Sequence, residues 1–404
     1  MTTVPDVGAA APSPSPMPTP TPFPAPVGSP PDHRGSWIPT GGMIATRFME
    51  LRKRRGLMIA LILVNVGIPT IFLAIRLLLH AFAPKSYGPA GGYNIYTGLT
   101  AGVMYIFGFI VAATLGATAG SIDLTEGMFR HLVVTGRSRL ALYLARIPAG
   151  LGIVLPLVAI GFTIVCAVCV FAAPATINFD GANLPAGLSL AGLESWAGDH
   201  ANTVICNFNY NGSINVNVPC ANGPVVQRGP GGPVISGTPP SGAVGQTPPA
   251  VLKALAAQIA AQDYSSYHSI FRYPSDSLMI QTGLWIELEA TIGFIVGLGL
   301  ASLLGQRTVA VILLIVLEIV LTPILSRARI PHMSNLQRSV VGLATAHLAP
   351  GGIPVFGGGG GGPGGGHGSP QLLPESTTVA VCVIVAWLVG WTIFGAWRMM
   401  TRDA

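Results

Sequence analysis

Charged residues are scarce in this chain of 404 residues. Asp, Glu, Lys and Arg together make up 9% of the sequence, whereas 50% of it is hydrophobic. Soluble domains carry about 25% charged residues. So few charges cannot cover the surface of a water-soluble protein of this length, which predicts that most of the chain faces lipid. The composition thus argues against an ordinary soluble enzyme.

Motifs for catalysis and for cofactor binding are also lacking. The Gly-x-x-x-x-Gly-Lys-Ser/Thr pattern that cradles nucleotide phosphates does not occur, and the six glycines at residues 357–362 are not followed by Gly-Lys-Ser/Thr. The eight histidines are dispersed without the spacing of metal ligands, and no Ser-His-Asp set is recognisable. We therefore expect no catalytic residue, no cofactor and no metal in this chain. The first 40 residues also lack the pattern of a signal peptide.

The five cysteines divide into two groups. Cys166 and Cys169 form a Cys-x-x-Cys pair inside an apolar segment, and Cys382 lies in another. Without polar neighbours to support redox or zinc chemistry, these three are interpreted as core residues. Cys206 and Cys220 lie in a long loop expected outside the cell, where a disulfide would contribute about 3 kcal/mol. We predict that these two are paired.

Six apolar segments are long enough to cross a hydrocarbon layer of about 30 Å, which takes about 20 residues of helix. The fold class expected is therefore an all-α membrane protein with six transmembrane helices. The segments are residues 57–82, 99–120, 148–173, 284–304, 309–325 and 377–397. Pro69 and Pro156 are expected to kink the first and third of them.

An interfacial helix is predicted at residues 43–56, before the first span. Met43, Ile44, Phe48, Met49 and Leu51 form its apolar face, and Arg47, Glu50 and residues 52–55 form its polar face. Such a basic amphipathic helix is typical of a segment lying on an anionic inner leaflet. Residues 1–42, which are rich in proline, are predicted to be a disordered cytoplasmic tail.

Basic residues indicate the orientation of the spans. They cluster before the first span and in the connector between the second and third, which carries Arg130, Arg137, Arg139 and Arg146. The positive-inside rule places both clusters, and both termini, in the cytoplasm, although Arg327 and Arg329 oppose it. A multi-pass protein of the plasma membrane is expected. The basic residues are interpreted as anchors for the spans, and no nucleic-acid partner is expected.

The orientation divides the chain into six regions. Residues 43–173 hold the interfacial helix, the first three spans and the connector, and residues 284–325 hold the fourth and fifth spans. Residues 174–283 form a large extracytoplasmic loop or small subdomain, with a helix expected from Val251. Residues 326–376 form an extracytoplasmic Gly-rich segment, and residues 377–404 hold the sixth span and the cytoplasmic C-terminus.

One acidic residue, Glu318, lies near the middle of the fifth span. A charged carboxylate facing lipid at that depth costs at least a few kcal/mol. Glu318 is therefore expected to face the bundle or a hydrated path, and two roles remain open. It either handles a substrate or a proton on the transport pathway, or forms a structural hydrogen bond to a neighbouring helix. Glu287 and Glu289, near the outer end of the fourth span, are interpreted as interfacial and solvated.

The connector at residues 124–147 has the features of a short amphipathic cytoplasmic helix. Asp123 can cap its start with Glu126 as capping-box partner, and Gly136 suits its C-terminal stop. Leu124, Met128 and Leu132 recur at helical spacing on one side. A plain positive-inside loop would explain the arginines, but it would not explain the cap, the apolar stripe and the glycine together.

Three segments resemble the membrane subunits of type 2 ABC exporters, a bacterial permease family with six spans. They are FMELRKRRGLMIALIL, IDLTEGMFRHLVVTGRSRLALYLARIPAG and VLEIVLTPIL. The resemblance covers about residues 43–400, although the long outer segments and the Pro-rich tail depart from the family's compact pattern. It implies that the connector docks in a groove of a separate ATPase subunit. The residues implied in that contact are Glu126, Phe129, Arg130, His131, Arg137 and Arg139.

The resemblance also implies partners and an energy source. ATP and magnesium would bind the partner ATPase, and a second permease copy or a paralogue would complete the transporter in the lipid bilayer. Two other functions remain open from the residues alone. The chain would be a proton-coupled secondary transporter that uses Glu318, or a non-transporting membrane scaffold that displays the outer loop. The sequence does not identify the exported substrate.

Overall fold

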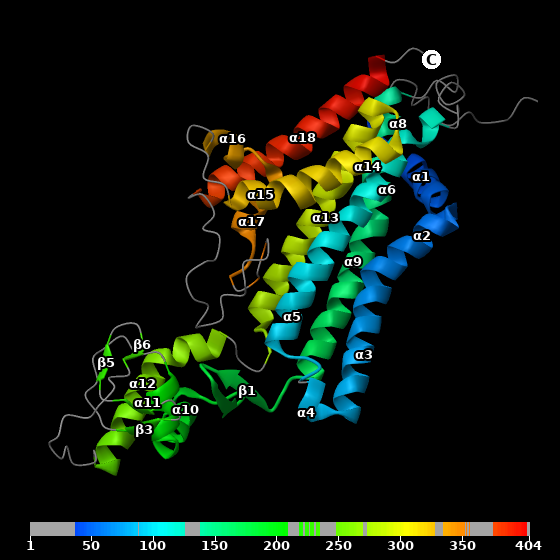
Figure 1. Cartoon of the computed structure of the whole chain (residues 1–404). Helices are drawn as coiled ribbons and strands as arrows, with labels where there is room; N and C mark the ends of the chain where they lie inside the picture. Colours follow the sequence, from blue (N-terminus) through cyan, green and yellow to red (C-terminus); the bar gives the residue numbers. More distant parts are fainter. Residues whose placement is uncertain are drawn as a thin grey trace, which may run out of the picture.

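The structure is a computed structural model of the whole chain. It describes residues 37–87, 89–125, 138–208, 218–220, 223–225, 227–229, 232–234, 248–269, 273–327, 334–351, 353, 355 and 375–401. Within these residues, six helical runs have the length and composition needed to cross a membrane (Figure 1). This confirms the expected number of spans. The prediction of a disordered tail falls mostly on residues 1–36, which lie outside the described part of the chain.

Spans one to three are each built from consecutive helical pieces. The interfacial position is occupied by α1, Gly41–Lys53. The first span comprises α2 Arg55–Ile62, η1 Leu63–Gly67 and α3 Ile68–Phe82, followed by α4 Pro84–Tyr87. The second comprises α5 Tyr93–Leu99, η2 Thr100–Met104 and α6 Tyr105–Thr125. The third comprises α8 Arg139–Leu144 and α9 Arg146–Phe171.

The fourth span is one long helix, and the fifth is interrupted. The fourth is α13 Asp276–Leu304, and the fifth comprises α14 Arg307–Ile315, η3 Val316–Leu321 and α15 Thr322–Arg327. Two short helices, α16 Ser334–Arg338 and α17 Val341–Leu348, precede the sixth span, α18 Thr377–Thr401. The hydroxyl of Ser275 caps the start of α13 by accepting from the amide of Leu278 at 3.3 Å. Gly305 ends α13 in a left-handed conformation with φ of 73°.

The two prolines that were expected to kink their spans lie in different helical surroundings. In the first span, the π-helical segment η1 ends at Gly67, two residues before Pro69. The widened hydrogen-bond ladder therefore precedes the residue that lacks an N–H. The side-chain amide of Asn65 in η1 donates from Nδ2 to the carbonyl of Leu61 in α2 at 3.0 Å. Pro156 lies inside α9, which continues as one helix to Phe171.

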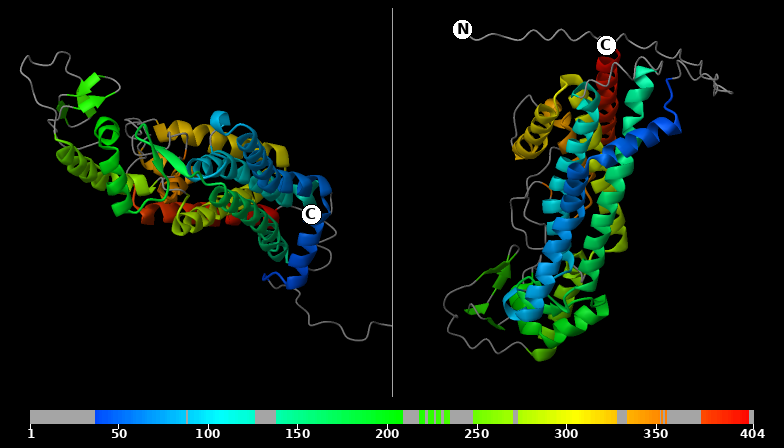
Figure 2. Two further views of the ribbon diagram at one scale, coloured as in Figure 1. Left: turned by 90° about the horizontal axis from the view of Figure 1, so that it is seen from below. Right: turned by 90° about the vertical axis from the view of Figure 1, so that its right-hand side faces the viewer.

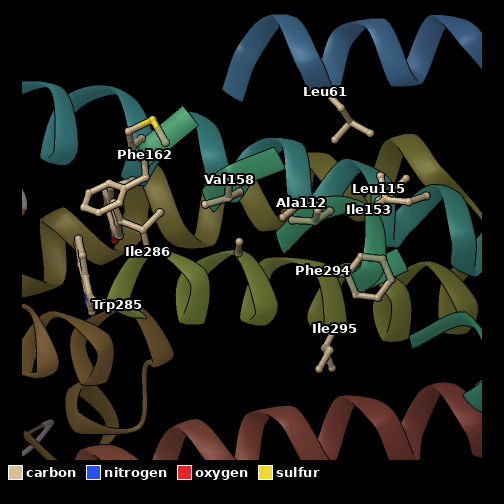
Figure 3. Close-up of a cluster of buried hydrophobic side chains, with 14 of the residues drawn as sticks. Leu61, Ala112, Leu115, Ile153, Val158, Phe162, Trp285, Ile286, Phe294 and Ile295 are labelled. Carbon is tan, nitrogen blue, oxygen red and sulfur yellow. The ribbon is translucent and has the colours of Figure 1, made fainter. Parts of the chain in front are cut away.

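Helix α13 lies at the centre of the bundle and packs against α6, α9 and α18 (Figure 1). Glycines allow the closest approach. A Cβ added at Gly116 of α6 would collide with the carbonyl of Phe294, and one at Gly297 of α13 would lie 2.5 Å from the carbonyl of Ala113. Small residues at such seams let backbones touch in a membrane. Figure 3 shows Ala112 and Leu115 of α6 and Ile153 and Val158 of α9 beside Ile286 and Phe294 of α13.

The long segment between the third and fourth spans folds on its own core beyond one end of the bundle (Figures 1 and 2). We call residues 174–275 the outer subdomain. Its core includes Phe179, Leu184, Leu193, Phe208 and Tyr267. Its helices are α10 Leu190–Asp199, α11 Ala201–Asn207 and α12 Pro249–Ser269, the last of which includes the helix expected from Val251.

The outer subdomain also contains strands, which an all-α expectation did not include. Among the described residues, the strands pair as three antiparallel hairpins: β1 Thr176–Phe179 with β2 Ala182–Pro185, β3 Val218–Cys220 with β4 Gly223–Val225, and β5 Gln227–Gly229 with β6 Gly232–Val234. The turn of the first hairpin places Asp180 and Gly181 at φ of 47° and 82°. Positive φ at both positions suits a tight two-residue hairpin turn.

The opposite end of the bundle collects α1, α8 and the end of α18 (Figures 1 and 2). We call it the α1 end. Here α1 packs against α9, and its orientation differs from the prediction in one respect. Arg47 is only 8% exposed and pairs with Glu50 at 2.7 Å, whereas Met49 is exposed. Placing Arg47 on the polar, outward face was therefore wrong, because the paired arginine can turn toward the bundle.

Candidate functional site

Glu318 lies in the π-helical segment η3 of the fifth span and points into the protein. Its side chain is 3% exposed, and the hydroxyl of Tyr105 in α6 donates a hydrogen bond to its Oε1 at 2.8 Å. The expectation that this acid faces the bundle is confirmed. A π-helical segment widens the helix by one residue per turn, and such segments occur often at functional sites. The role of Glu318 in transport stays a prediction.

A second carboxylate, that of Glu289 in α13, lies close enough to interact with Glu318. Glu289 is 1% exposed, so interpreting it as solvated at the membrane surface was wrong. The reason is the length of α13. This helix begins at Asp276 rather than at residue 284, which places Glu289 more than three turns inside it instead of at its outer end. Glu287 is partly buried on the same helix.

Aromatic and helical contacts enclose this carboxylate pair. The rings of Tyr105 and Trp285 stack with centroids 5.2 Å apart, and the indole N–H of Trp285 donates to the carbonyl of Thr345 at 3.0 Å. Thr345 belongs to α17 and also interacts with Glu289. The carboxylate of Glu318 lies against Gly342, where an added Cβ would collide with both of its oxygens. Helix α17 therefore covers the pair and fits only because residue 342 is glycine.

The pair is incompletely satisfied. Oε1 of Glu289 and Oε2 of Glu318 are buried and have no hydrogen-bond partner among the described residues. The side chains that interact with the carboxylates there, those of Tyr105, Thr322 and Thr345, are neutral. Two buried carboxylates side by side repel each other unless a proton or a cation lies between them. The arrangement can therefore hold a proton or a small cation at the junction of α6, α13, η3 and α17.

A second polar cluster lies at the α1 end. Arg146 at the start of α9 is 1% exposed, and its Nη1 donates to the carbonyl of Gly120 at 3.2 Å. The hydroxyl of Ser302 in α13 donates to the same carbonyl at 3.3 Å. This buried arginine, expected only as a positive-inside charge, thus joins α9 to α6, and Ser302 joins α13 to the same point. Arg47 and Glu50 of α1 lie beside it around a small shared pocket.

The residues implied in ATPase docking fall mostly outside the described part of the chain. These are Glu126, Phe129, Arg130, His131 and Arg137. Arg139, in α8, is described, and its Nη1 donates to the carbonyl of Met400 at 3.1 Å. The connector therefore leaves α6 after Thr125 and returns at α8, which is fastened to the end of α18. No signal in the sequence pointed to that last contact, since it joins residues far apart in the chain.

The cysteines separate as their surroundings suggested. Cys206, in α11 of the outer subdomain, is disulfide-bonded. Cys166, Cys169 and Cys382 carry free thiols. Cys169 is buried and Cys166 is partly buried, but Cys382 is exposed, so interpreting Cys382 as a core residue was wrong. Cys220 ends strand β3, but its side chain lies outside the described part. Its pairing with Cys206 therefore stays a prediction.

Comparison with known proteins does not assign a family. No protein-family model, no curated protein and no solved structure matches the chain. The described part of the chain holds six helices suited to crossing a membrane, which suggests a multi-pass membrane protein.

Proposed function

We propose that the chain is the membrane-spanning permease subunit of an ATP-driven exporter of the type 2 ABC kind. The observation that carries the proposal is the clustering at the α1 end of the bundle. There α1, both flanks of the connector and the end of α18 come together, while the outer subdomain lies at the other end (Figure 1). A cytoplasmic energy-supplying partner needs such a face, since the sequence carries no Walker-type nucleotide motif of its own.

The contacts at the α1 end suit the transmission of force. A partner that moves the connector moves α6 and α8 directly. Arg146 passes the movement from α9 to the Gly120 carbonyl of α6, and Ser302 passes it on to α13. Arg139 links α8 to the end of α18 through the Met400 carbonyl. In this proposal the connector acts as a coupling helix that moves four spans together.

The partners follow from the mechanism. Two ATPase subunits, which bind ATP and magnesium, close on nucleotide and press on the connector of each permease. A second copy of this chain or a paralogue completes the pathway, and the α1 end faces the cytoplasm of a bacterial cell. The spans then rearrange and release the substrate outward. The carboxylate pair of Glu289 and Glu318, covered by α17, is placed on the pathway in this proposal.

The test is the Phe129→Ala variant, which removes a candidate aromatic anchor from the ATPase contact. An aromatic anchor in an interface contributes about 2 kcal/mol or more. We expect wild-type amounts of inserted protein, weaker co-purification of the ATPase from native membranes, and loss of export. Phe107→Ala in α6 is the matched control, because that ring is 41% exposed on the membrane-facing side of a span. Unchanged docking and export in Phe129→Ala would reject the coupling helix.

The orientation is tested separately with an impermeant thiol reagent on intact cells. Because Cys206 is disulfide-bonded, we expect labelling of the outer subdomain only after reduction. A Cys206→Ser, Cys220→Ser double variant is the control that identifies signal from the remaining cysteines. Labelling of Cys206 that requires cell lysis as well as reduction would place the α1 end outside and reject the proposed topology.

One observation favours a second candidate, a proton-coupled secondary transporter. The bundle buries two neighbouring acids, Glu289 and Glu318, whereas only Glu318 was expected to be buried from the sequence. Buried acids inside membranes often relay protons. Transport into inverted vesicles distinguishes the two functions. Dependence on ATP that persists after the proton gradient is dissipated supports the exporter, whereas dependence on the gradient alone supports the second candidate. A non-transporting scaffold displaying the subdomain would show neither.

A further inference from the structure

A cavity of about 430 Å³ lies where the bundle meets the outer subdomain. Its wall on the bundle side includes Arg76 of α3 together with Pro89, Gly91, Tyr93, Asn94 and Ile95. Its other wall includes Thr176, Asn178 and Asn183 of the β1–β2 hairpin. It is separate from the carboxylate pair and from the α1 end. None of the functions considered above requires it.

The cavity has one charged side chain among its described lining residues, Arg76. A guanidinium of Arg76 donates from Nη2 to the carbonyl of Pro89 at 2.7 Å, and its Nε is buried without a hydrogen-bond partner. Since the Pro89 carbonyl is neutral, it orients the arginine without cancelling its charge. Asp180, in the turn of the same hairpin, does not line the cavity. The positive charge is therefore left for a ligand.

Further polar groups lie around the arginine. Tyr93 and Asn94 begin the second span, and neither side chain makes a hydrogen bond to the described residues, although both line the cavity. On the opposite wall, Asn178 donates to the side chain of Asn183 at 3.2 Å across the hairpin. One cation together with phenol, amide and hydroxyl donors is the combination that binds an anionic oxygen group such as a phosphate ester.

The floor of the cavity is held rigidly. Gly92 has φ of 92°, and its amide donates to the carbonyl of Cys169 in α9 at 2.9 Å. A Cβ added at Gly91 would lie 2.9 Å from the backbone of Ala172. The segment that presents Tyr93 and Asn94 is therefore fixed against the end of α9. A preformed wall binds a ligand without first losing conformational entropy.

The side chains around the cavity indicate what kind of phosphate ester fits. It lies beside the subdomain ends of α3 and α9, where Leu78, Phe82 and Phe171 are strongly exposed. Exposed aliphatic and aromatic side chains at a span end are typical of contact with acyl chains and the headgroup layer. An arginine near a span end commonly extends toward that layer. An amphiphile with its chains along α3 and its phosphate in the cavity satisfies both features.

We propose that this cavity binds the phosphate group of an anionic amphiphile, such as a phospholipid of the leaflet on the subdomain side. Arg76 pairs with the phosphate, and Tyr93 and Asn94 donate hydrogen bonds to its oxygens. The β1–β2 hairpin closes the site from the subdomain side, so binding couples the position of the subdomain to the lipid. The proposal holds for any of the functions considered, because it concerns a different surface of the protein.

The test measures retention of phosphatidylglycerol by the purified full-length protein with native mass spectrometry. Wild-type protein, Arg76→Gln and a charge control, Lys253→Gln, are compared. Lys253 is an exposed cation of the outer subdomain that pairs with Asp199 and does not line the cavity. We expect binding to weaken at least about tenfold in Arg76→Gln, the loss that follows when one charge-assisted hydrogen bond is removed. Lys253→Gln should bind like the wild type. Equal retention by all three proteins would overturn the proposal.

Two further arms identify the ligand chemistry. Diacylglycerol has the chains but no phosphate, so retention equal to that of phosphatidylglycerol would overturn phosphate recognition. Glycerol phosphate has the phosphate but no chains. Displacement of phosphatidylglycerol by glycerol phosphate at equal concentration would overturn the inference that the ligand is an amphiphile.

If Arg76→Gln does not fold, Asn178→Asp replaces it. That exposed change puts a negative charge on the opposite wall, and it should weaken phosphatidylglycerol binding while leaving diacylglycerol retention unchanged. Unweakened phosphatidylglycerol binding in Asn178→Asp would overturn the site.

Discussion

The bundle and the outer subdomain are packed by opposite means. In the bundle, α6 and α13 meet through glycines such as Gly116 and Gly297, and the backbones touch where no side chain intervenes. In the subdomain, aromatic rings fill the centre, with Phe179 edge-on to both Phe208 and Tyr267 at centroid distances of 5.1 and 5.9 Å. The same chain therefore changes its packing residues when it leaves the membrane.

The difference follows from the solvent. In water, burial of large apolar rings provides most of the driving force, so big side chains stabilise the subdomain. Within lipid, apolar burial drives little, and close van der Waals contact between helices matters more. Two of the large buried rings in the bundle, Trp285 and Tyr105, also carry a polar atom to a hydrogen-bond partner. Removing a large ring should therefore destabilise the subdomain, whereas enlarging a glycine should destabilise the bundle.

The largest expected effect is on the subdomain, from Phe179→Ala. Removing a buried ring costs about 3–5 kcal/mol. We expect amides of α10 and α12 to lose protection from hydrogen exchange while those of α6 and α13 keep it. The exposed ring of Phe394 in α18 provides the control, since Phe394→Ala removes the same group where it faces outward. If α6 and α13 lost protection equally, the two regions would have to unfold as one unit.

The next effect is on the bundle, from Gly116→Ala. The added methyl meets the carbonyl of Phe294 and must push α13 away from α6, which costs about 1–3 kcal/mol. Gly390→Ala in α18 is the matched control, because an added Cβ there has no atom within 4 Å. We expect a lower melting temperature in detergent for the first variant and an equal or higher one for the second. Equal melting of both would mean that the α6–α13 seam is not tight.

A smaller effect, dependent on pH, is expected in the subdomain from Tyr267→Phe. The hydroxyl of Tyr267 donates to the carbonyl of Pro185 at 2.8 Å and accepts from the amide of Leu188 at 3.0 Å. Leaving these groups unpaired costs about 1–3 kcal/mol. Burial raises the pKa of Tyr267, so its contribution to stability is complete below the unfolded pKa of about 10 and is lost as pH rises through the folded pKa.

The measurement is the free energy of subdomain opening at neutral and at strongly alkaline pH. We expect the alkaline loss to be smaller in Tyr267→Phe than in the wild type, because phenylalanine has no proton to release. Tyr87→Phe, at an exposed position in α4, controls for the general effect of alkaline pH on the protein. An alkaline loss unchanged by Tyr267→Phe would assign it to other groups.

The smallest effect on stability is expected from Glu318→Gln. Glutamine has the same shape and keeps an oxygen that accepts the hydrogen bond of Tyr105, so the melting temperature should change by less than the equivalent of about 1 kcal/mol. If the carboxylate handles cargo, transport falls while co-purification of the ATPase persists. Wild-type transport by this variant would leave Glu318 with a structural role only.

The sequence was sufficient for the six spans, because each needs only a long apolar run. The inward orientation of Glu318 was also predictable, since an isolated acid in lipid is too costly. Glu289 was misplaced because eight residues of moderate polarity before residue 284 are helical, and hydropathy alone did not extend the helix through them. Helix α17 was hidden in a segment interpreted as a Gly-rich loop. Arg47 and Arg146 were assigned to surfaces because charge count carries no information about burial.

The glycine seam between α6 and α13 has a consequence for how the gene can vary. Every single-nucleotide change that alters a glycine codon introduces a larger side chain or a stop signal. At Gly116 and Gly297 each such residue would meet a carbonyl of the facing helix. Substitutions on the exposed faces of these spans should therefore be tolerated, whereas no single-nucleotide change at Gly116 or Gly297 gives a residue that fits the seam. A substitution in the facing helix cannot compensate, because the atom that the new side chain meets is a main-chain carbonyl; the helices themselves would have to move apart.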